Sequence, residues 1–179
     1  RSDKERYFRY KKDERQKVIN YAIDRAIEDG YIFCKFIRTD LSIDEKNNRD
    51  FGVFPLYPEY SWGTIAAWAW GYSLIIDWLE EQSFVDLDKI VITGHSRGGK
   101  TALCAGIYDE RIAITVPNSS GGGGTASWRY YDEEHERQLI SYHDTVFPYW
   151  WDENFLQFKD SVEWLPFDAH FNKALIAPR

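Results

Sequence analysis

A serine flanked by two glycines is the feature of this sequence best suited to chemistry. Residues 94–98 read Gly-His-Ser-Arg-Gly, a G-x-S-x-G pattern between a strand-like apolar run and a helix-like run of small residues. A tight turn there would present the Ser96 hydroxyl as a nucleophile outside the sheet, with small Gly94 and Gly98 letting the backbone pass closely. The amide of Arg97, at the start of the helix, would face a developing oxyanion. We therefore expect an acyl-transfer site at this turn.

The same turn also fits a phosphate-binding pattern. Residues 94–101 match G-x-x-x-x-G-K-[ST], with Lys100 as the phosphate-binding lysine of a P-loop. A P-loop NTPase also needs a second apolar strand that ends in a magnesium-binding aspartate, whereas the run at 112–116 is followed by Pro-Asn. The serine turn is therefore favoured, and an inert strand–turn–helix is the third alternative.

Strand-like and helix-like segments alternate on both sides of this turn, which predicts an α/β fold with a parallel sheet and crossover helices. Hydrophobic spacing predicts helices at 13–29, 64–82 and 99–107 and strands at 31–37, 90–93 and 112–116. The charged, Gly- and Pro-rich stretch 38–63 is expected to be a surface loop. Beyond Pro117 the chain is expected to be irregular, and the apolar run 174–177 resembles the start of another strand.

Length and composition limit the classes of function. The chain has 179 residues, of which 44% are hydrophobic, and a net charge of −7, so it is one domain's worth of sequence without the basic surface that nucleic acid or an anionic membrane attracts. It has no apolar run of the roughly 20 residues that span a bilayer. Cys34 and Cys104 have no metal-site spacing and are expected to be buried thiols. The chain lacks methionine and begins at Arg1, so we expect it to be a piece of a larger protein.

Several sequence blocks together resemble the glucuronoyl esterases, carbohydrate esterase family 15, and their order is similar to that of the bacterial branch. These blocks are residues 62–71, 94–100, 118–124, 147–150, 165–170 and 174–179. The resemblance implies that residues 1–179 are a partial catalytic domain, a three-layer α/β-hydrolase sandwich truncated at both ends. It implies a secreted or periplasmic enzyme that hydrolyses the ester between 4-O-methyl-glucuronate of xylan and lignin alcohols, with no metal or organic cofactor.

The resemblance also assigns roles to individual residues. Ser96 resembles the nucleophile, and Arg97 the arginine that stabilises the oxyanion through side chain and backbone. Lys100 resembles the lysine that hydrogen-bonds sugar hydroxyls. Glu134 falls near the sugar-binding glutamate, although its surroundings, Tyr-Asp-Glu-Glu-His at 131–135, depart from the family pattern.

Plainer alternatives stay open for these polar and aromatic residues. Lys100 could be a solvated lysine in the first helical turn, and Glu134 could belong to a solvated acidic face. The adjacent Trp150 and Trp151 could pack in the core rather than stack on a sugar ring.

One departure from the family concerns the catalytic partners of the serine. Some members carry a triad glutamate just after the strand that follows the nucleophile helix, but residues 117–120 here read Pro-Asn-Ser-Ser. The acid and the histidine are therefore expected beyond Arg179, and this chain alone is expected to be nearly inactive. Two further functions stay open, an acetyl-xylan or other carbohydrate esterase on the same scaffold, and a non-catalytic carbohydrate-binding module.

Overall fold

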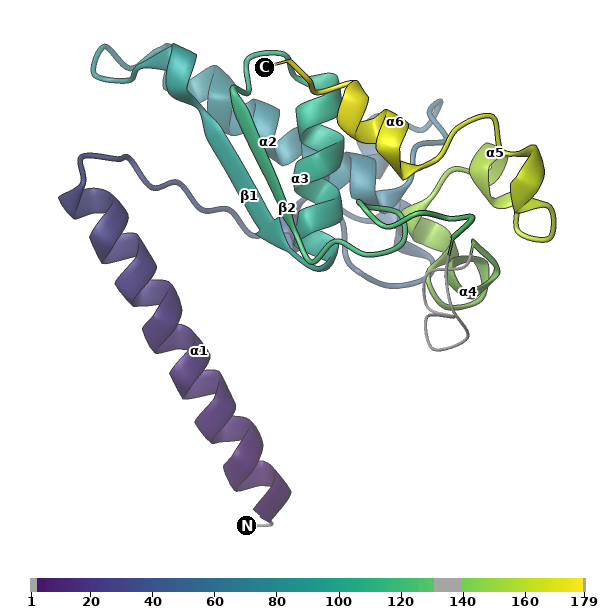
Figure 1. The fold of residues 1–179 in the computed structure, drawn as a ribbon, viewed down its shortest axis with the longest axis horizontal. Coiled ribbons are helices and arrows are strands. Elements are labelled where there is room, and N and C mark those ends of the chain that lie inside the picture. Colours follow the sequence, from purple (N-terminus) through teal and green to yellow (C-terminus); the bar gives the residue numbers. More distant parts are fainter. Residues whose placement is uncertain (1–2, 131–139, 179) are drawn as a thin grey trace. The chain divides into compact units, whose positions relative to one another are not determined.

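The computed structural model describes residues 3–130 and 140–178 and divides the chain into two compact units, residues 1–35 and 36–179 (Figure 1). The first unit is built on helix α1, Asp3–Glu28, which begins ten residues before the predicted start at 13. It ends at Glu28, one residue before the predicted end at 29, and Gly30 follows as the predicted cap, where its φ of 87° lets the amide of Tyr31 bond back to the carbonyl of Ala26 at 2.9 Å. Among the described residues, no helix combines the length and the apolar character needed to cross a membrane.

The second unit contains the predicted strand–helix–strand crossover. Strand β1, Val91–His95, leads into helix α3, Arg97–Tyr108, and strand β2, Ile114–Asn118, returns parallel to β1 with Val91 opposite Ile114. The strands lie one to two residues later than the sequence predicted. Helix α2, Thr64–Glu80, packs with α3 against one face of this two-stranded sheet (Figure 1). The apolar core between them contains Ala69, Ile76, Ile90, Ile92, Ala102, Ala105 and Ile112.

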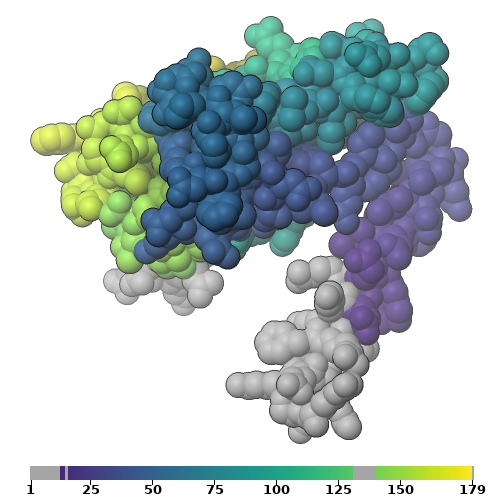
Figure 2. Space-filling view, turned by 180° about the vertical axis from the view of Figure 1, so that it is seen from behind, coloured from purple at the N-terminus to yellow at the C-terminus, as the bar shows by residue number. Residues whose placement is uncertain are grey.

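The segment 38–63 is more than a surface loop, which corrects the prediction. It forms short 3-10 turns and spreads over one side of the unit (blue in Figure 2). Its Ser42 and Asn48 are buried, and Asn48 donates to the side chain of Thr64 at 2.5 Å. The indole of Trp68 in turn donates to the Ser42 carbonyl at 2.7 Å. The polar residues of this segment thus complete hydrogen bonds around the start of α2.

Two predicted strands are absent from the described part of the chain. Residues 31–37 have no ladder partner, and residues 174–177 lie in the last residue of a helix and the turn after it. An apolar run becomes a strand only where a neighbouring strand pairs with it. The region after Pro117, predicted to be irregular, includes among its described residues the short α-helices α4 (Ile140–Val146), α5 (Glu153–Leu156) and α6 (Ala169–Ala174).

A buried carboxylate organises this last region. Asp168 caps α6 by accepting from the Ala169 amide at 2.7 Å, and it also accepts from the Trp128 amide at 2.8 Å and the Ser127 hydroxyl at 2.6 Å. The Trp128 ring packs in a cluster with Ile140 and Leu165. Asp168 therefore joins segments about 40 residues apart in sequence.

Candidate active site

Ser96 occupies the predicted tight turn between β1 and α3. Its φ of 56° and ψ of −119° lie where residues other than glycine are rare, and its side chain is exposed. The Ser96 amide donates to the carbonyl of Asn118 at 3.0 Å, and its carbonyl accepts from the amide of Lys100 at 3.1 Å. A strained backbone that presents a hydroxyl at a helix N-terminus suits a nucleophile whose oxyanion needs amide donors.

Gly94 and Gly99 make this turn possible, whereas the sequence suggested Gly94 and Gly98. A Cβ on Gly94 would collide with the carbonyl of Gly98, and a Cβ on Gly99 would lie 2.6 Å from the carbonyl of Asn118. A Cβ on Gly98 would meet no atom within 4 Å. The expectation that Gly98 must be small is therefore wrong, and Gly99 has that role.

The Lys100 side chain is bound to the loop that follows β2, which excludes the phosphate-binding alternative. Helix α3 already begins at Arg97, so the P-loop pattern forms no open cradle. The Lys100 side chain, 8% exposed, donates to the carbonyls of Ser120 and Gly122, the latter at 2.5 Å. Burial, with the nearby positive charge of Arg97, lowers the pKa of Lys100 to about 8. The alternative of a solvated lysine is therefore wrong.

The Arg97 side chain lies on an aromatic platform. The rings of Phe147 and Trp150 stack with centroids 3.9 Å apart, and the Arg97 guanidinium lies 5.2 Å from the Trp150 ring and 5.7 Å from the Phe147 ring. Trp150 is buried and thus packs in the core, while Trp151 is partly exposed and lies against Gly123. The aromatic segment therefore supports the residue that follows Ser96.

Asp44 completes the surroundings of Arg97, and sequence reasoning missed it. Its carboxylate forms an ion pair with Arg97 and accepts from the Trp150 indole at 2.9 Å, the Tyr149 hydroxyl at 3.2 Å and Arg38 at 3.4 Å. Burial alone would raise the pKa of Asp44, but these hydrogen bonds outweigh it and the pKa lies below its usual value. Apart from Arg97 itself, the feature singled out in the sequence that belongs to this site is the aromatic block at 147–150, where Tyr149 and Trp150 donate to Asp44.

No histidine in the described residues hydrogen-bonds the Ser96 hydroxyl. Within residues 3–130 and 140–178, no hydrogen bond reaches the Ser96 hydroxyl. His143 is buried, and its Nδ1 accepts from the Trp151 indole at 3.3 Å. His170 is exposed on α6, beside the ring of Phe171. A general base must lie about 2.6–3.2 Å from the hydroxyl it deprotonates, and none of these meets that requirement here.

Three other candidates from the sequence are Glu134 and the two cysteines. Glu134 lies in the segment 131–139, outside the described residues. The described part of the chain contains no group of three or more His, Cys, Asp or Glu side chains placed to bind a metal. Both cysteines have free thiols. Cys104 packs against the apolar core, and burial raises the pKa of its thiol to about 12, whereas Cys34 is exposed, which corrects the expectation for that residue.

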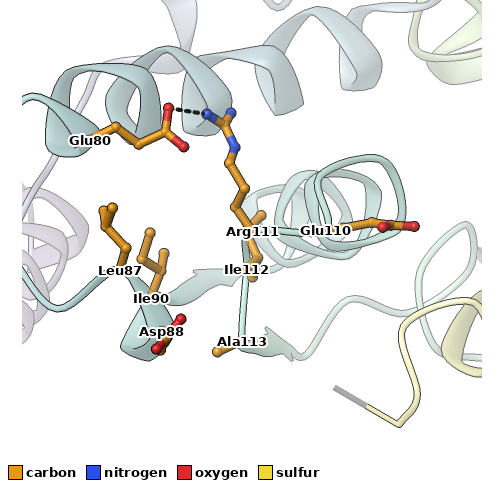
Figure 3. Close-up of a pocket in the computed structure, with 8 residues that line it drawn as sticks. All are labelled: Glu80, Leu87, Asp88, Ile90, Glu110, Arg111, Ile112 and Ala113. Atoms are coloured by element: carbon orange, nitrogen blue, oxygen red, sulfur yellow. Dashed lines mark hydrogen bonds and ion pairs between the residues drawn. The ribbon is translucent and has the colours of Figure 1, made fainter.

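A cavity of about 370 Å³ lies at the other end of the sheet (Figure 3). Its lining includes Ile90 and Ala113, which directly precede β1 and β2, whereas Ser96 follows the carboxyl end of β1. Arg111, which lines this cavity, donates to Glu80 at 2.9 Å (Figure 3). Ligands of open α/β sheets bind at the carboxyl ends of the strands, so this cavity is not the candidate site.

Known proteins share this arrangement of segments. The family described as "Glucuronyl esterase, fungi" matches residues 9–179. The chain belongs to the glucuronoyl esterase family. "Carbohydrate esterase MZ0003" from an unknown prokaryotic organism is 39% identical over 171 residues, which are 89% of this chain and 38% of that protein. The "4-O-methyl-glucuronoyl methylesterase" of Hypocrea jecorina is 42% identical over 126 residues, 67% of this chain and 27% of that protein.

Solved structures of glucuronoyl esterases have the same fold. The enzyme from Solibacter usitatus has a TM-score of 0.70 and 36% identity, over 79% of this chain and 37% of that chain. A family 15 enzyme from Teredinibacter turnerae has a TM-score of 0.83 and 28% identity, over 100% of this chain and 43% of that chain. The expected α/β-hydrolase class is confirmed, and the chain spans only about two fifths of these relatives.

Proposed function

We propose that residues 1–179 are the part of a glucuronoyl esterase catalytic domain that supplies the nucleophile and the oxyanion-binding groups. The observation that supports this most directly is the exposed Ser96 hydroxyl on a backbone with φ of 56°, at the start of α3. The proposed reaction is hydrolysis of the ester between 4-O-methyl-glucuronate of xylan and a lignin alcohol. Membership of the glucuronoyl esterase family supports this reaction.

The proposed mechanism is acyl transfer through Ser96. A histidine beyond Arg179, oriented by an acid, takes the hydroxyl proton, and the serine oxygen attacks the ester carbonyl. The Arg97 amide and guanidinium stabilise the oxyanion. The alcohol leaves with the proton from the histidine, and water then hydrolyses the glucuronoyl-serine ester. None of these steps requires a metal or an organic cofactor.

The relatives support a uronic acid ester as substrate. Six curated relatives with between 38% and 42% identity are named 4-O-methyl-glucuronoyl methylesterase. A mutant glucuronoyl esterase from Sporotrichum thermophile, 32% identical over 80% of this chain and 42% of that chain with a TM-score of 0.69, was solved with methyl 4-O-methyl-β-D-glucopyranuronate. The lignin alcohol and the xylan chain are the finer part of our proposal. Because such a substrate is a wall polymer, we place the enzyme outside the cell or in the periplasm.

We propose Lys100 and Glu134 as the residues that contact the sugar. An ammonium has three N–H donors, and Lys100 uses two of them on backbone carbonyls. The third donor is available for a sugar hydroxyl. Glu134 would accept from a second hydroxyl.

The test compares two esters on the full-length natural protein. We expect release of benzyl alcohol from benzyl glucuronate and little release of acetate from acetylated xylan. Ser96→Ala should lower the first activity by about 10⁴-fold or more, because triad residues act as a unit. Ser96-dependent acetate release as the main activity would favour another carbohydrate esterase. Ester hydrolysis that does not depend on Ser96 would contradict the mechanism, and binding of xylan without hydrolysis would favour a non-catalytic module.

A further inference from the structure

The Arg97 guanidinium is fixed in place more firmly than its exposure predicts. Its side chain is 38% exposed, and a long arginine side chain in water loses roughly 2 kcal/mol of rotamer entropy when it is immobilised. Packing on the rings of Phe147 and Trp150 restrains one face of the guanidinium. Its in-plane direction is set by the ion pair with Asp44. The carboxylate therefore decides where the N–H groups of this arginine point.

Asp44 can do this because it is itself held from several directions. Its side chain is 13% exposed. Its Oδ1 accepts from the Trp150 indole at 2.9 Å and from the Tyr149 hydroxyl at 3.2 Å, and that hydroxyl also donates to the Asp44 carbonyl at 2.9 Å. The ion pair with Arg97 uses the other oxygen, Oδ2. The carboxylate is therefore a fixed acceptor rather than a mobile counter-ion.

The same pair also sets the charge beside Ser96. Two guanidinium groups, those of Arg97 and Arg38, share the Asp44 carboxylate, so the three side chains together carry one positive charge. Hydrolysis of a uronic acid ester converts a neutral group into a carboxylate. A guanidinium that is already paired attracts a second carboxylate less strongly than an unpaired one.

We propose that Asp44 is a positioning residue for the reaction at Ser96. It holds the Arg97 guanidinium where the oxyanion develops, and it limits the affinity of that guanidinium for the carboxylate product. This inference rests on the proposed function, because it requires Arg97 to contact the reacting ester. A purely structural carboxylate would explain the ion pair equally well but would not control how tightly the acid product binds.

The experiment uses Asp44→Asn in the full-length natural protein, with benzyl glucuronate as substrate and glucuronate as the added product. Asparagine keeps the size of the side chain and an oxygen acceptor but removes the charge. We expect kcat to fall by roughly 10- to 100-fold with little change in KM, since losing one oxyanion donor outright costs about 10² to 10³. We expect the inhibition constant of glucuronate to fall by about 3- to 10-fold, because the pairing carboxylate is lost.

A double-mutant cycle separates positioning from folding. In Arg97→Met, the guanidinium is absent, so adding Asp44→Asn should cause no further loss of kcat and no tightening of glucuronate. If Asp44→Asn does not fold, Trp150→Phe provides a second test, because it keeps a six-membered ring under Arg97 and removes the indole donor to Asp44 together with part of a buried ring. That variant should lower kcat by roughly 3- to 10-fold, and again only when Arg97 is present.

Asp168→Asn is the matched control. Asp168 is likewise a buried carboxylate held by several donors, among them Ser127, Trp128 and Ala169, which do not belong to the site. It should lower the melting temperature while leaving kcat and the glucuronate inhibition constant within about twofold. The inference would be overturned if Asp44→Asn kept the wild-type kcat and product affinity. It would also be overturned if Asp44→Asn lowered kcat by the same factor in the Arg97→Met background as in the wild type. Either result would leave the proposed function intact as long as Ser96→Ala is inactive in the same assay.

Discussion

The amide of Ser96 donates a 3.0 Å hydrogen bond to the carbonyl of Asn118, so the ends of β1 and β2 are joined at the turn that presents the hydroxyl. The Ser96 carbonyl is also engaged, by the amide of Lys100 at 3.1 Å. With both backbone groups fixed, Ser96 cannot leave its φ of 56° without breaking the junction between strand and helix. The surrounding backbone therefore maintains the strain of the turn.

This strain predicts a stabilising substitution at the proposed nucleophile. Ser96→Gly should raise the free energy of unfolding by about 1 kcal/mol relative to Ser96→Ala, because glycine adopts positive φ without a Cβ penalty. Both variants lack the hydroxyl and should be inactive, so their difference reports the backbone alone. Urea denaturation gives the two midpoints. Equal midpoints would mean that the turn stores no strain.

The crowding around the turn makes a second prediction. Gly94→Ala should destabilise the protein by about 3 kcal/mol, because its Cβ would overlap the carbonyl of Gly98 and backbone has no room to yield. Gly98→Ala is the control within the same motif, and because its Cβ meets open space it should change stability by no more than about 0.5 kcal/mol. Thermal unfolding of the two variants measures both effects. A Gly98 variant as unstable as the Gly94 variant would contradict the geometry described here.

The features that sequence predicted correctly are those with local signals. Helix α2 has apolar residues on nearly every face, and the turn at Ser96 lies between a short apolar run and a run of small residues. Each of these patterns lies within about 20 residues, so the sequence contains it directly. The failed strand at 31–37 had the right residue types, but a strand also needs a partner that those residues do not specify.

Asp44 shows what local patterns cannot reveal. Its partners Arg97 and Trp150 lie 53 and 106 residues further along the chain, and it stands in a charged loop where nothing marks it out. Lys100 was found by its place after the serine, but its burial against the segment 120–122 depends on the crossover that brings β2 beside β1. In both cases the tertiary fold, rather than spacing along the chain, sets the electrostatic surroundings.

A third prediction concerns the buried ammonium of Lys100. Lys100→Met should lower the free energy of unfolding by about 2 kcal/mol, because the carbonyls of Ser120 and Gly122 lose their charged donor. Lys173 is the matched control, since it also donates to a carbonyl of this loop, that of Thr125 at 3.4 Å, but is exposed. Lys173→Met should cost no more than about 0.5 kcal/mol. Equal losses in urea denaturation would show that the burial of Lys100 does not matter.

The fourth prediction is a pH dependence at the far end of α3. The buried Asp109 carboxylate binds Arg111 through both oxygens, at 2.9 and 2.8 Å, and accepts from the Ser73 hydroxyl at 2.7 Å. The hydrogen bonds from Arg111, which outweigh the effect of burial, lower the pKa of Asp109 from 3.8 to about 2. Between these two values the unfolded chain binds more protons than the folded chain, so the stability that Asp109 adds is complete above its ordinary pKa and is lost as the pH falls toward 2.

Asp109→Asn should therefore lower the free energy of unfolding by about 1 to 2 kcal/mol at pH 7, and the difference from the wild type should shrink below pH 4 as the native carboxylate is protonated. Glu110→Gln removes an adjacent, exposed carboxylate and should change stability by no more than about 0.5 kcal/mol at any pH. Urea denaturation of the three proteins at several values between pH 2.5 and pH 7 measures both curves. A difference for Asp109→Asn that stays constant down to the lowest pH would show that the carboxylate charge is not what stabilises this end of the helix.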